Sequence, residues 1–279
     1  MKDKIALITG GASGIGRAIA EAFARQGATL IVADKNKAHL GEVEAAFDGM
    51  GFELLAVHCD VTVSSDVASL MDRVTGQFGK LDVLVNNVGD FLGKIKPLER
   101  MSDDDIDSLF TVNLRHVMVC SRDAIPLLKK AGAGSSIISI SSIEGYRGMP
   151  NITPYGAYKL GIEGFTKSLA LELATDGIRV NAIAPETTET EQVCPQNWIA
   201  PEDYQRTHHW VPLGRFGQPS DIAGCALFLA SDMAAWVTGT VTHCDGGALA
   251  AAGWYRTPTG EWTNTPIVDR SGIPSMIVE

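Results

Sequence analysis

Features that would place a protein in a membrane or on a nucleic acid are scarce in this chain of 279 residues. Charge, glycine or polar residues interrupt every apolar stretch before it reaches about 18 residues, the minimum for a membrane-spanning helix. Basic residues are in deficit, with 23 Lys and Arg against 33 Asp and Glu and a net charge of −10. A diffuse acidic surface repels phosphate backbones. We therefore expect no membrane and no nucleic-acid partner.

Cysteine is also scarce, and its spacing forms no motif. The five cysteines lie at positions 59, 120, 194, 225 and 244, an odd number without a C-x-x-C pair. The segment Met1–Ile5 runs straight into a short apolar run and lacks the apolar core of a secretion signal. These absences predict reduced thiols and a cytoplasmic protein. Cys194, His208 and His209 fit no structural zinc spacing, so no metal site is predicted.

What the chain does contain is a regular alternation of short apolar runs and amphipathic segments. Strands are predicted at 5–8, 29–33, 54–59, 81–85, 136–140, 178–183 and 240–243, and helices at 15–26, 37–49, 64–78, 103–130, 154–176 and 221–231. Strands that alternate with such helices form parallel sheets covered on both faces. We expect an α/β fold, a single doubly wound Rossmann-type domain over residues 1–279 with about seven parallel strands. Two segments break the alternation, 186–219 and 248–279.

A glycine-rich turn follows the first predicted strand. The segment Thr9–Gly16 has its glycines in the order G-x-x-x-G-x-G, which allows a tight turn and lets a pyrophosphate approach the backbone where a helix begins. Asp34 lies at the end of the second predicted strand, 18 residues after Gly16. A carboxylate there accepts hydrogen bonds from an adenosine ribose and repels a 2′-phosphate. The two features together predict a site for NAD rather than NADP, against the plain alternative of a geometric turn and a capping aspartate.

Tyr155 and Lys159 are four residues apart at the start of a predicted helix, so they share one face. A tyrosine has an ordinary pKa of about 10, and its use as a base near pH 7 requires that pKa to fall by about three, or roughly 4 kcal/mol. A neighbouring ammonium, together with the positive nicotinamide of bound NAD⁺, can supply that fall. On its own, a Y-x-x-x-K pattern is usually an exposed helix pair.

With these motifs in order, the chain resembles the short-chain dehydrogenase/reductase family from about residue 4 to Gly247. Further motifs of the family follow in the expected order: Asp60-Val61, Asn86-Asn87-Val88-Gly89, Val112-Asn113-Leu114, Ser141-Ser142, Arg179–Pro185, Gly214–Pro219 and Asp245-Gly246-Gly247. The resemblance implies an enzyme that interconverts a secondary alcohol and a ketone by hydride transfer. It also implies a homotetramer.

The resemblance assigns four catalytic roles. Tyr155 corresponds to the general acid/base, and Lys159 to the group that lowers its pKa and hydrogen-bonds the nicotinamide ribose. Ser142, which lies 13 residues before Tyr155, corresponds to the group that orients the substrate oxygen, with Ser141 as the weaker candidate. Asn113 corresponds to the residue that supports a water relaying protons to Lys159. Separately, Ser142 could be a loop cap and Asn113 a helix-bend residue, but the four together imply catalysis.

The resemblance also implies a set of cofactor contacts. In the family, the positions of Asp60 and Val61 flank the adenine, and that of Thr190 contacts the nicotinamide carboxamide. The full implied set is Gly10, Ser13, Gly14, Ile15, Gly16, Asp34, Asp60, Val61, Asn87, Gly89, Tyr155, Lys159, Pro185, Thr188 and Thr190.

Three positions depart from the family pattern. Glu186 follows Pro185 where the family usually has glycine, and its side chain is expected to narrow the nicotinamide pocket or alter the next loop. Val88 replaces a small alanine, and Tyr158 stands where serine is frequent. Tyr155 nevertheless keeps the position of the base.

The substrate is expected to lie under a lid formed by residues 186–219. The predicted substrate residues are Glu144, Met149, Ile152, Trp198 and Trp210. Apolar walls with few polar groups favour a hydrophobic cyclic substrate such as a steroid, a terpenoid or a ring diol. The C-terminal extension, 248–279, holds aromatic residues that a disordered tail rarely carries, so we expect it to pack across a subunit interface.

Two other functions stay open. A catalytically silent NAD-binding redox sensor would have the same cofactor site, but it would be expected to lack at least one of the four catalytic residues. An enoyl reductase or an epimerase would share the fold, although enoyl reducers of this fold usually separate their tyrosine and lysine more widely.

Overall fold

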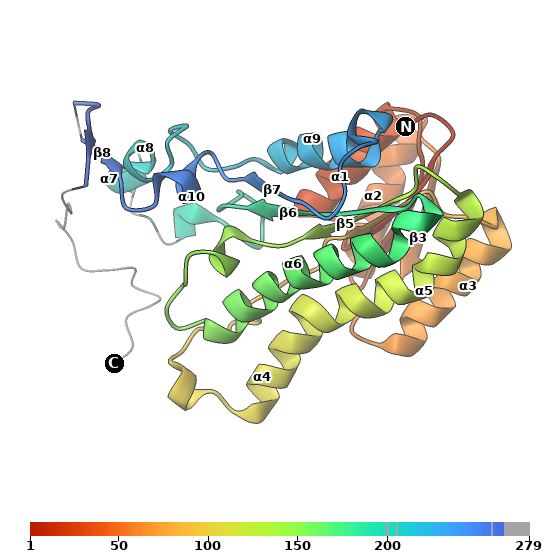
Figure 1. Ribbon diagram of the computed structural model, residues 1–279, viewed down its shortest axis with the longest axis horizontal. Coiled ribbons are helices and arrows are strands. Elements are labelled where there is room, and N and C mark those ends of the chain that lie inside the picture. The colour runs from red at the N-terminus through yellow and green to blue at the C-terminus, as the bar shows by residue number, and fades with distance from the viewer. Residues whose placement is uncertain (198, 200, 205, 258, 265–279) are drawn as a thin grey trace.

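The structure is a computed structural model that describes residues 1–197, 199, 201–204, 206–257 and 259–264 (Figure 1). A parallel sheet forms its middle layer. Its strands are β1 (Ile5–Thr9), β2 (Thr29–Asp34), β3 (Leu54–His58), β4 (Val83–Asn86), β5 (Ser136–Ile140), β6 (Arg179–Pro185) and β7 (Val241–Cys244). The strand order is β3-β2-β1-β4-β5-β6-β7, and every neighbouring pair is parallel. This arrangement confirms the predicted α/β fold with seven parallel strands.

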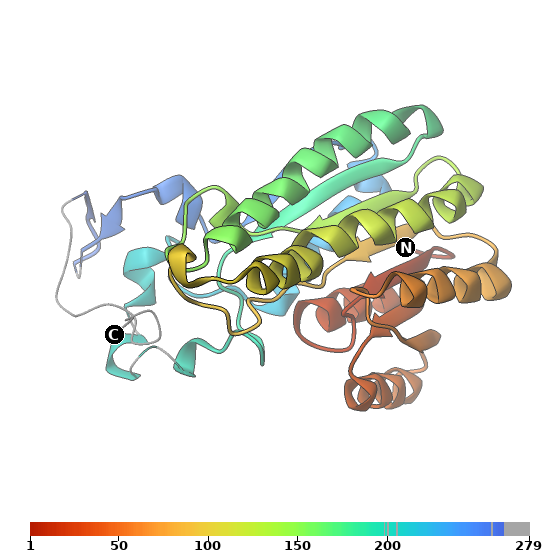
Figure 2. The ribbon, with the colours of Figure 1, turned by 90° about the horizontal axis from the view of Figure 1, so that it is seen from below.

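Six long helices cover the two faces of the sheet (Figures 1 and 2). On one face lie α1 (Gly14–Arg25), α2 (Lys37–Gly49) and α9 (Pro219–Ala230), and on the other α3 (Ser64–Phe78), α5 (His116–Ala131) and α6 (Thr153–Leu173). The strands are apolar almost throughout because helices bury them from both sides. Most elements begin and end within a few residues of the bounds that the sequence predicts.

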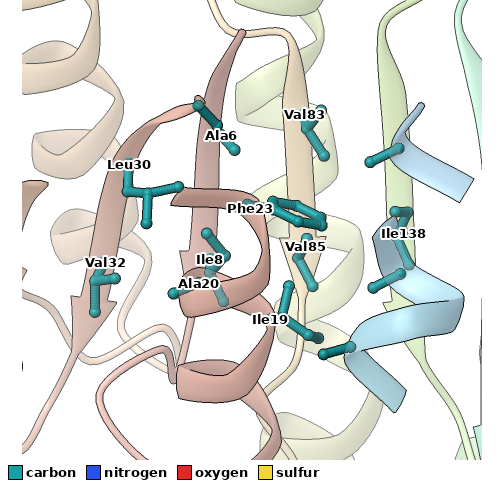
Figure 3. Close-up of a cluster of buried hydrophobic side chains, with 14 of the residues drawn as sticks. Ala6, Ile8, Ile19, Ala20, Phe23, Leu30, Val32, Val83, Val85 and Ile138 are labelled. Carbon is teal, nitrogen blue, oxygen red and sulfur yellow. The ribbon is translucent and has the colours of Figure 1, made fainter. Parts of the chain in front are cut away.

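Helix α1 is fixed to the sheet by a cluster of apolar side chains. Ile19 and Phe23 of this helix point onto the strands, where they meet Ile8 of β1 and Val85 of β4 (Figure 3). All four side chains are fully buried. Because α1 begins at the glycine-rich turn, this packing also fixes the position of that turn over the carboxyl ends of β1 and β4.

The helix predicted at 103–130 is in fact divided. Helix α4 (Asp103–Phe110) is followed by one π-helical turn, Thr111–Arg115, and only then by α5. A π turn inserts an extra residue into the hydrogen-bond ladder, which periodicity cannot reveal because the apolar stripe continues on both sides. Asn113 lies in this turn.

The segments that break the alternation gather beyond the carboxyl end of the sheet, at the left of Figure 1. They form α7 (Pro201–Tyr204), α8 (Thr207–Trp210), α10 (Ala248–Ala251) and an antiparallel pair of β8 (Tyr255–Arg256) with β9 (Trp262–Thr263). His209 of α8 hydrogen-bonds the carbonyl of Arg256, so this hairpin rests on the lid segment of its own chain. Packing of the extension across a subunit interface stays a prediction.

No helix in the described ranges is long and apolar enough to cross a membrane.

Phe23 offers a direct test of how the core supports the turn. Replacing it with alanine leaves a cavity beneath α1, and we expect the Phe23→Ala variant to lose about 3–5 kcal/mol in its free energy of unfolding by urea denaturation. Phe228, which is 37% exposed on α9, is the matched control, and its replacement by alanine should cost far less. Equal losses in the two variants would show that α1 is not anchored in this way.

Candidate active site

The predicted site residues come together where the parallel strands end. The strand order reverses between β1 and β4, and in open α/β sheets the crevice at such a reversal is the usual ligand site. The segments after β1, β2, β3, β4, β5 and β6 carry the cofactor and catalytic candidates, so these strands bring together positions that are far apart in the sequence.

The glycine-rich turn has a geometry that only glycine permits. Gly10 and Gly14 have φ values of +61° and +51°, in the left-handed region. A Cβ atom on Gly16 would lie 2.2 Å from the carbonyl oxygen of Gly10, so no side chain fits there. Ser13 is the N-cap of α1, yet its hydroxyl makes no capping hydrogen bond. The start of α1 therefore combines a backbone that a ligand can approach closely with an uncommitted hydroxyl, which fits a pyrophosphate.

The loop after β4 braces this turn. The side-chain amide of Asn87 donates to the carbonyls of Thr9 and Gly10, at 3.1 and 3.0 Å. Val88 lies directly against Gly10, where a Cβ atom would meet its methyl carbon at 3.0 Å. The valine that departs from the family pattern thus packs against the glycine-rich turn.

Asp34 lies at the carboxyl end of β2 and reaches back towards the turn. Its carboxylate accepts hydrogen bonds from the backbone amides of Ala12 at 3.3 Å and Asn36 at 2.9 Å, and the residue stays half-buried. Both bonds hold the carboxylate beside the start of the turn. A negative charge fixed here fits a ribose with a free 2′-hydroxyl and opposes a 2′-phosphate.

Asp60 and Val61 follow β3 at the same edge of the sheet. Val61 is buried, and the Asp60 carboxylate accepts hydrogen bonds from the Thr62 amide at 2.9 Å and the Thr62 hydroxyl at 2.7 Å. Burial alone would raise the pKa of Asp60, but these two bonds and the nearby Lys35 and His58 lower it below its ordinary value. Asp60 is therefore a charged residue that holds its own loop in place.

Tyr155 and Lys159 lie on one face of α6, as their spacing predicts. The Lys159 ammonium nitrogen is 5.5 Å from the centre of the Tyr155 ring. The hydroxyl of Ser142 acts on Tyr155 and lowers its pKa. Ser141 is buried and donates instead to the carbonyl of Lys159 at 2.8 Å, which leaves Ser142 as the serine beside the tyrosine. Tyr158 turns away from this group, because its hydroxyl donates to the carbonyl of Ile106.

The surroundings of Tyr155 act on its pKa in opposite directions. Burial raises the pKa of Tyr155, the Ser142 hydroxyl lowers it, and the negative charges of Glu144 and Asp90 raise it further, so the net direction is upward. The predicted fall of this pKa depends on Lys159 together with the positive nicotinamide of NAD⁺, and it stays a prediction.

Lys159 is buried almost completely. Its ammonium donates to the carbonyl of Ile140, the last residue of β5, at 3.0 Å. A Cβ atom on Gly89 would lie 2.7 Å from the ammonium nitrogen, so glycine at this position leaves the space that the lysine occupies. Burial lowers the pKa of Lys159 to about 8.

Asn113 uses its side chain to hold the loop after β4. Its amide oxygen accepts from the Asp90 amide at 3.1 Å, and its amide nitrogen donates to the carbonyls of Asp90 and Leu109 at 2.8 and 3.0 Å. The π turn directs this side chain inward, where it is fully buried. The side chain therefore positions the residues next to Gly89, and its role with a water stays a prediction.

Two further residues at the site carry no sequence signal that identifies them. The ring of Phe91 lies 4.5 Å from that of Tyr155 and covers it. His116 is fully buried with its Nε2 atom 3.0 Å from the carbonyl oxygen of Val88. Burial and the charge of Lys159 lower the pKa of His116 to about 3, so it is neutral. Phe91 stands in an irregular loop, and His116 fits the apolar stripe of its helix. The sequence therefore gives no sign that either residue belongs to the site.

The start of the lid crosses the cleft beside the glycine-rich turn. A Cβ atom on Gly14 would lie 3.2 Å from the methyl carbon of Thr190, and the Gln192 side chain donates to the carbonyl of Gly89 at 3.0 Å. Pro185 and Thr188 are buried at the base of this segment. Thr190 thus lies against the glycine-rich turn, and its contact with the nicotinamide stays a prediction.

The predicted substrate residues are only partly brought together. Glu144 and Met149 line a cavity of about 410 Å³ beside the start of α6. Ile152 is 1% exposed and does not line that cavity. Trp210 is exposed on α8 and makes an edge contact with Phe216. Trp198 lies outside the described residues.

Known proteins match this chain over most of its length. A family model described as Enoyl-(Acyl carrier protein) reductase matches residues 10–248. The chain is 39% identical over 250 residues to the 3-oxoacyl-(acyl-carrier-protein) reductase FabG of Thermotoga maritima, which covers 89% of this chain and 99% of that protein.

Two solved structures share the fold and a third of the sequence. One is a 7α-hydroxysteroid dehydrogenase in complex with NADH and 7-oxo glycochenodeoxycholic acid, with a TM-score of 0.81, 34% identity, and coverage of 88% of this chain and 94% of that chain. The other is levodione reductase, with a TM-score of 0.82, 33% identity, and coverage of 90% and 99%. A short chain dehydrogenase from Burkholderia cenocepacia, similar at a TM-score of 0.81, is in complex with NADP. Nicotinamide cofactors of both kinds therefore occur among the relatives.

The buried lysine predicts a specific pH dependence of stability. The pKa of Lys159 is about 8 in the folded protein and about 10.4 in an unfolded chain. Between these values the folded chain has released a proton that the unfolded chain keeps, so the Lys159 contribution makes the free energy of unfolding rise with pH, by up to ~1.4 kcal/mol per pH unit.

Urea denaturation of the cofactor-free protein from pH 7.5 to 10 measures this effect. The Lys159→Met variant should lack the rise, whereas Lys167→Met, which removes an exposed lysine from the same helix, should keep it. The same pH slope in wild type and Lys159→Met would contradict the assignment.

Proposed function

We propose that this chain, which belongs to the short-chain dehydrogenase/reductase family, interconverts a secondary alcohol and a ketone with NAD as its cofactor. It is an oxidoreductase of that family that uses a nicotinamide cofactor and a small-molecule substrate. The observation that carries the proposal is the group formed by Ser142, Tyr155 and Lys159, in which a buried ammonium lies 5.5 Å from the centre of the tyrosine ring.

Each of these residues has one task in the proposed reaction. Ser142 donates a hydrogen bond to the substrate oxygen and so holds the reacting carbon in place. Tyr155 takes the proton of the alcohol, or returns it to the ketone. Lys159 hydrogen-bonds the nicotinamide ribose and adds positive charge next to the phenol. The nicotinamide, when bound, accepts or supplies the hydride, and its oxidised form brings the additional positive charge that the raised pKa of Tyr155 requires.

NAD is proposed over NADP because of the charge at the end of β2. Asp34 is held by two backbone amides and keeps its carboxylate at the glycine-rich turn. The turn itself, from Gly10 to Gly16, contains no Lys or Arg to bind a 2′-phosphate. Lys35 follows Asp34 directly, but it is exposed. The charge balance at this position therefore favours a free 2′-hydroxyl.

The proposed substrate is hydrophobic and cyclic. Support comes from the aromatic cover that Phe91 provides over Tyr155. Two of the similar structures are a hydroxysteroid dehydrogenase and levodione reductase.

A homotetramer in the cytoplasm is proposed for the working enzyme. Leu171, Met233 and Trp236 are 81%, 82% and 99% exposed in the single chain, and large apolar side chains at such exposure are typical of contacts between subunits. All five cysteines are free thiols, as expected in a reducing compartment.

Reduction of an enoyl bond is the second candidate, because the matching family model is described by that activity. Only three residues separate Tyr155 from Lys159, whereas enoyl reducers of this fold usually have a wider spacing. The spacing favours carbonyl and alcohol chemistry.

The role of Tyr155 is tested by removing its hydroxyl. With NAD⁺ and a panel of cyclic, steroidal and aromatic secondary alcohols, we expect NADH formation at 340 nm by the wild type and a loss of about 10²–10⁴-fold in Tyr155→Phe. Tyr158→Phe removes a phenol from the same helix that faces away, and it should keep most of the activity. Equal activity in wild type and Tyr155→Phe would exclude the proposed base.

The cofactor preference is tested at Asp34. We expect Asp34→Asn to raise the ratio of kcat/KM for NADP⁺ to that for NAD⁺ by about tenfold or more, because the repulsion of the 2′-phosphate is removed. Asp48→Asn removes one charge from the exposed side of α2 and serves as the matched control. A wild type that prefers NADP⁺ would overturn this part of the proposal.

A further inference from the structure

A single arginine joins three segments at the substrate side of the site. Arg147, in the loop between β5 and α6, donates to the Glu144 carboxylate from Nη2 at 2.6 Å and from Nε at 3.1 Å. Its Nη2 atom also lies 2.7 Å from the carboxylate of Glu186, at the base of the lid. Its guanidinium carbon is 5.7 Å from the ring centre of Trp210 on α8. Arg147 is therefore held through Nε and Nη2 by carboxylates of its own loop and of the lid, and its guanidinium also lies near the ring of Trp210.

The cluster of Glu144, Arg147 and Glu186 is built into the fold rather than spread over the surface. The Glu186 side chain is only 4% exposed and that of Glu144 14%. The second carboxylate oxygen of Glu186 accepts from the Thr187 amide at 2.7 Å and from the Thr187 hydroxyl at 2.8 Å. Glu186 is also the residue that stands where the resemblance leads one to expect glycine. Buried charges of this kind are costly unless they are paired and hydrogen-bonded.

The cluster carries an unbalanced negative charge. Two carboxylates share one guanidinium, so the sum is −1 when all three groups are ionised. The backbone amide of Glu144 donates to the hydroxyl of Ser142 at 3.2 Å, which places Glu144 beside the proposed reacting centre, and its negative charge raises the pKa of Tyr155. Asp90 adds a second negative charge that acts on Tyr155 from the loop after β4. An arginine near an active site often binds an acidic substrate, but here its donors face two protein carboxylates.

We propose that the Glu144–Arg147–Glu186 cluster is a charge filter that admits neutral alcohols and ketones and disfavours substrates with a carboxylate or phosphate near the reacting carbon. The inference rests on the proposed function, because it concerns the same site. Its physical basis is Coulomb repulsion from the two largely buried carboxylates, which at a separation of several ångströms changes a binding constant by about tenfold.

A matched pair of ligands tests the filter. The pair is 3-oxocyclohexanecarboxylate and its neutral methylamide, which have the same ring and ketone and differ by one negative charge. Dissociation constants are measured for the enzyme–NADH complex from the change in NADH fluorescence, and turnover is followed separately. Binding reports on the filter even if neither ketone is reduced, so failure of the filter and failure of the proposed reaction are distinguishable.

We expect the wild type to bind the methylamide about tenfold more tightly than the carboxylate. Glu144→Gln should bring this ratio close to one, and 0.5 M NaCl should reduce it in the wild type because salt screens the charge. Asp72→Asn, which removes one charge from the exposed side of α3, should leave the ratio unchanged. Glu186→Gln provides a second removal of charge within the cluster if Glu144→Gln does not fold, which thermal melting reports.

Two results would overturn the inference. One is a wild type that binds the carboxylate as tightly as the methylamide. The other is a folded Glu144→Gln variant whose preference for the methylamide over the carboxylate equals that of the wild type, since this would show that the charge of Glu144 does not act on the bound ligand.

Discussion

The active site depends on one buried ammonium. Lys159 lies beneath Tyr155 with little access to water, and burial of such a charge is unfavourable unless the surroundings are arranged for it. The carbonyl of Ile140 accepts a hydrogen bond from the Lys159 ammonium. Gly89 has no side chain and so leaves the space that this ammonium occupies. Asn113 holds the backbone next to Gly89 through Asp90, and the π turn is what aims Asn113 inward. Strand β5, the loop after β4 and the junction of α4 with α5 therefore all serve the position of a single charged group.

The sheet supplies the frame in which these loops meet. Its parallel strands end at one edge, and the reversal of order between β1 and β4 opens the crevice there. Burial of Phe23 fixes α1, the glycines of the turn let a ligand approach its first amides, and Asp34 sets a negative charge beside them. The same edge holds the lid, whose base at Glu186 is tied to the loop after Ser142 by Arg147. Cofactor and substrate sites are thus joined through short segments that follow strands.

Local patterns explain which features were predictable. Apolar runs marked the strands because helices cover both faces of the sheet. The glycines of the turn, Asp34, Tyr155 and Lys159 were predictable because their residue types and their spacing along the chain are typical of a nicotinamide cofactor site and a catalytic pair. The π turn around Asn113 was not visible, since an extra residue in a helix leaves the apolar stripe almost unchanged. Two contacts join residues that are far apart in the sequence: Arg147 pairs with Glu186, 39 positions away, and His209 contacts Arg256, 47 positions away. Helix and strand periodicity cannot predict contacts over such separations. The raised pKa of Tyr155 arises from burial and from the charges of Glu144 and Asp90. The four-residue spacing between Tyr155 and Lys159 gives no information about either of these effects.

The central claim is that this site moves a hydride between the carbinol carbon of an alcohol and NAD. The most direct measurement uses cyclic secondary alcohols deuterated at that carbon, with mass spectrometry of the nicotinamide product after incubation with NAD⁺ and the wild-type enzyme. We expect NADH that carries one deuterium, together with the corresponding ketone. An enzyme that binds NAD⁺ but yields neither deuterated NADH nor ketone from any of these alcohols would contradict the claim.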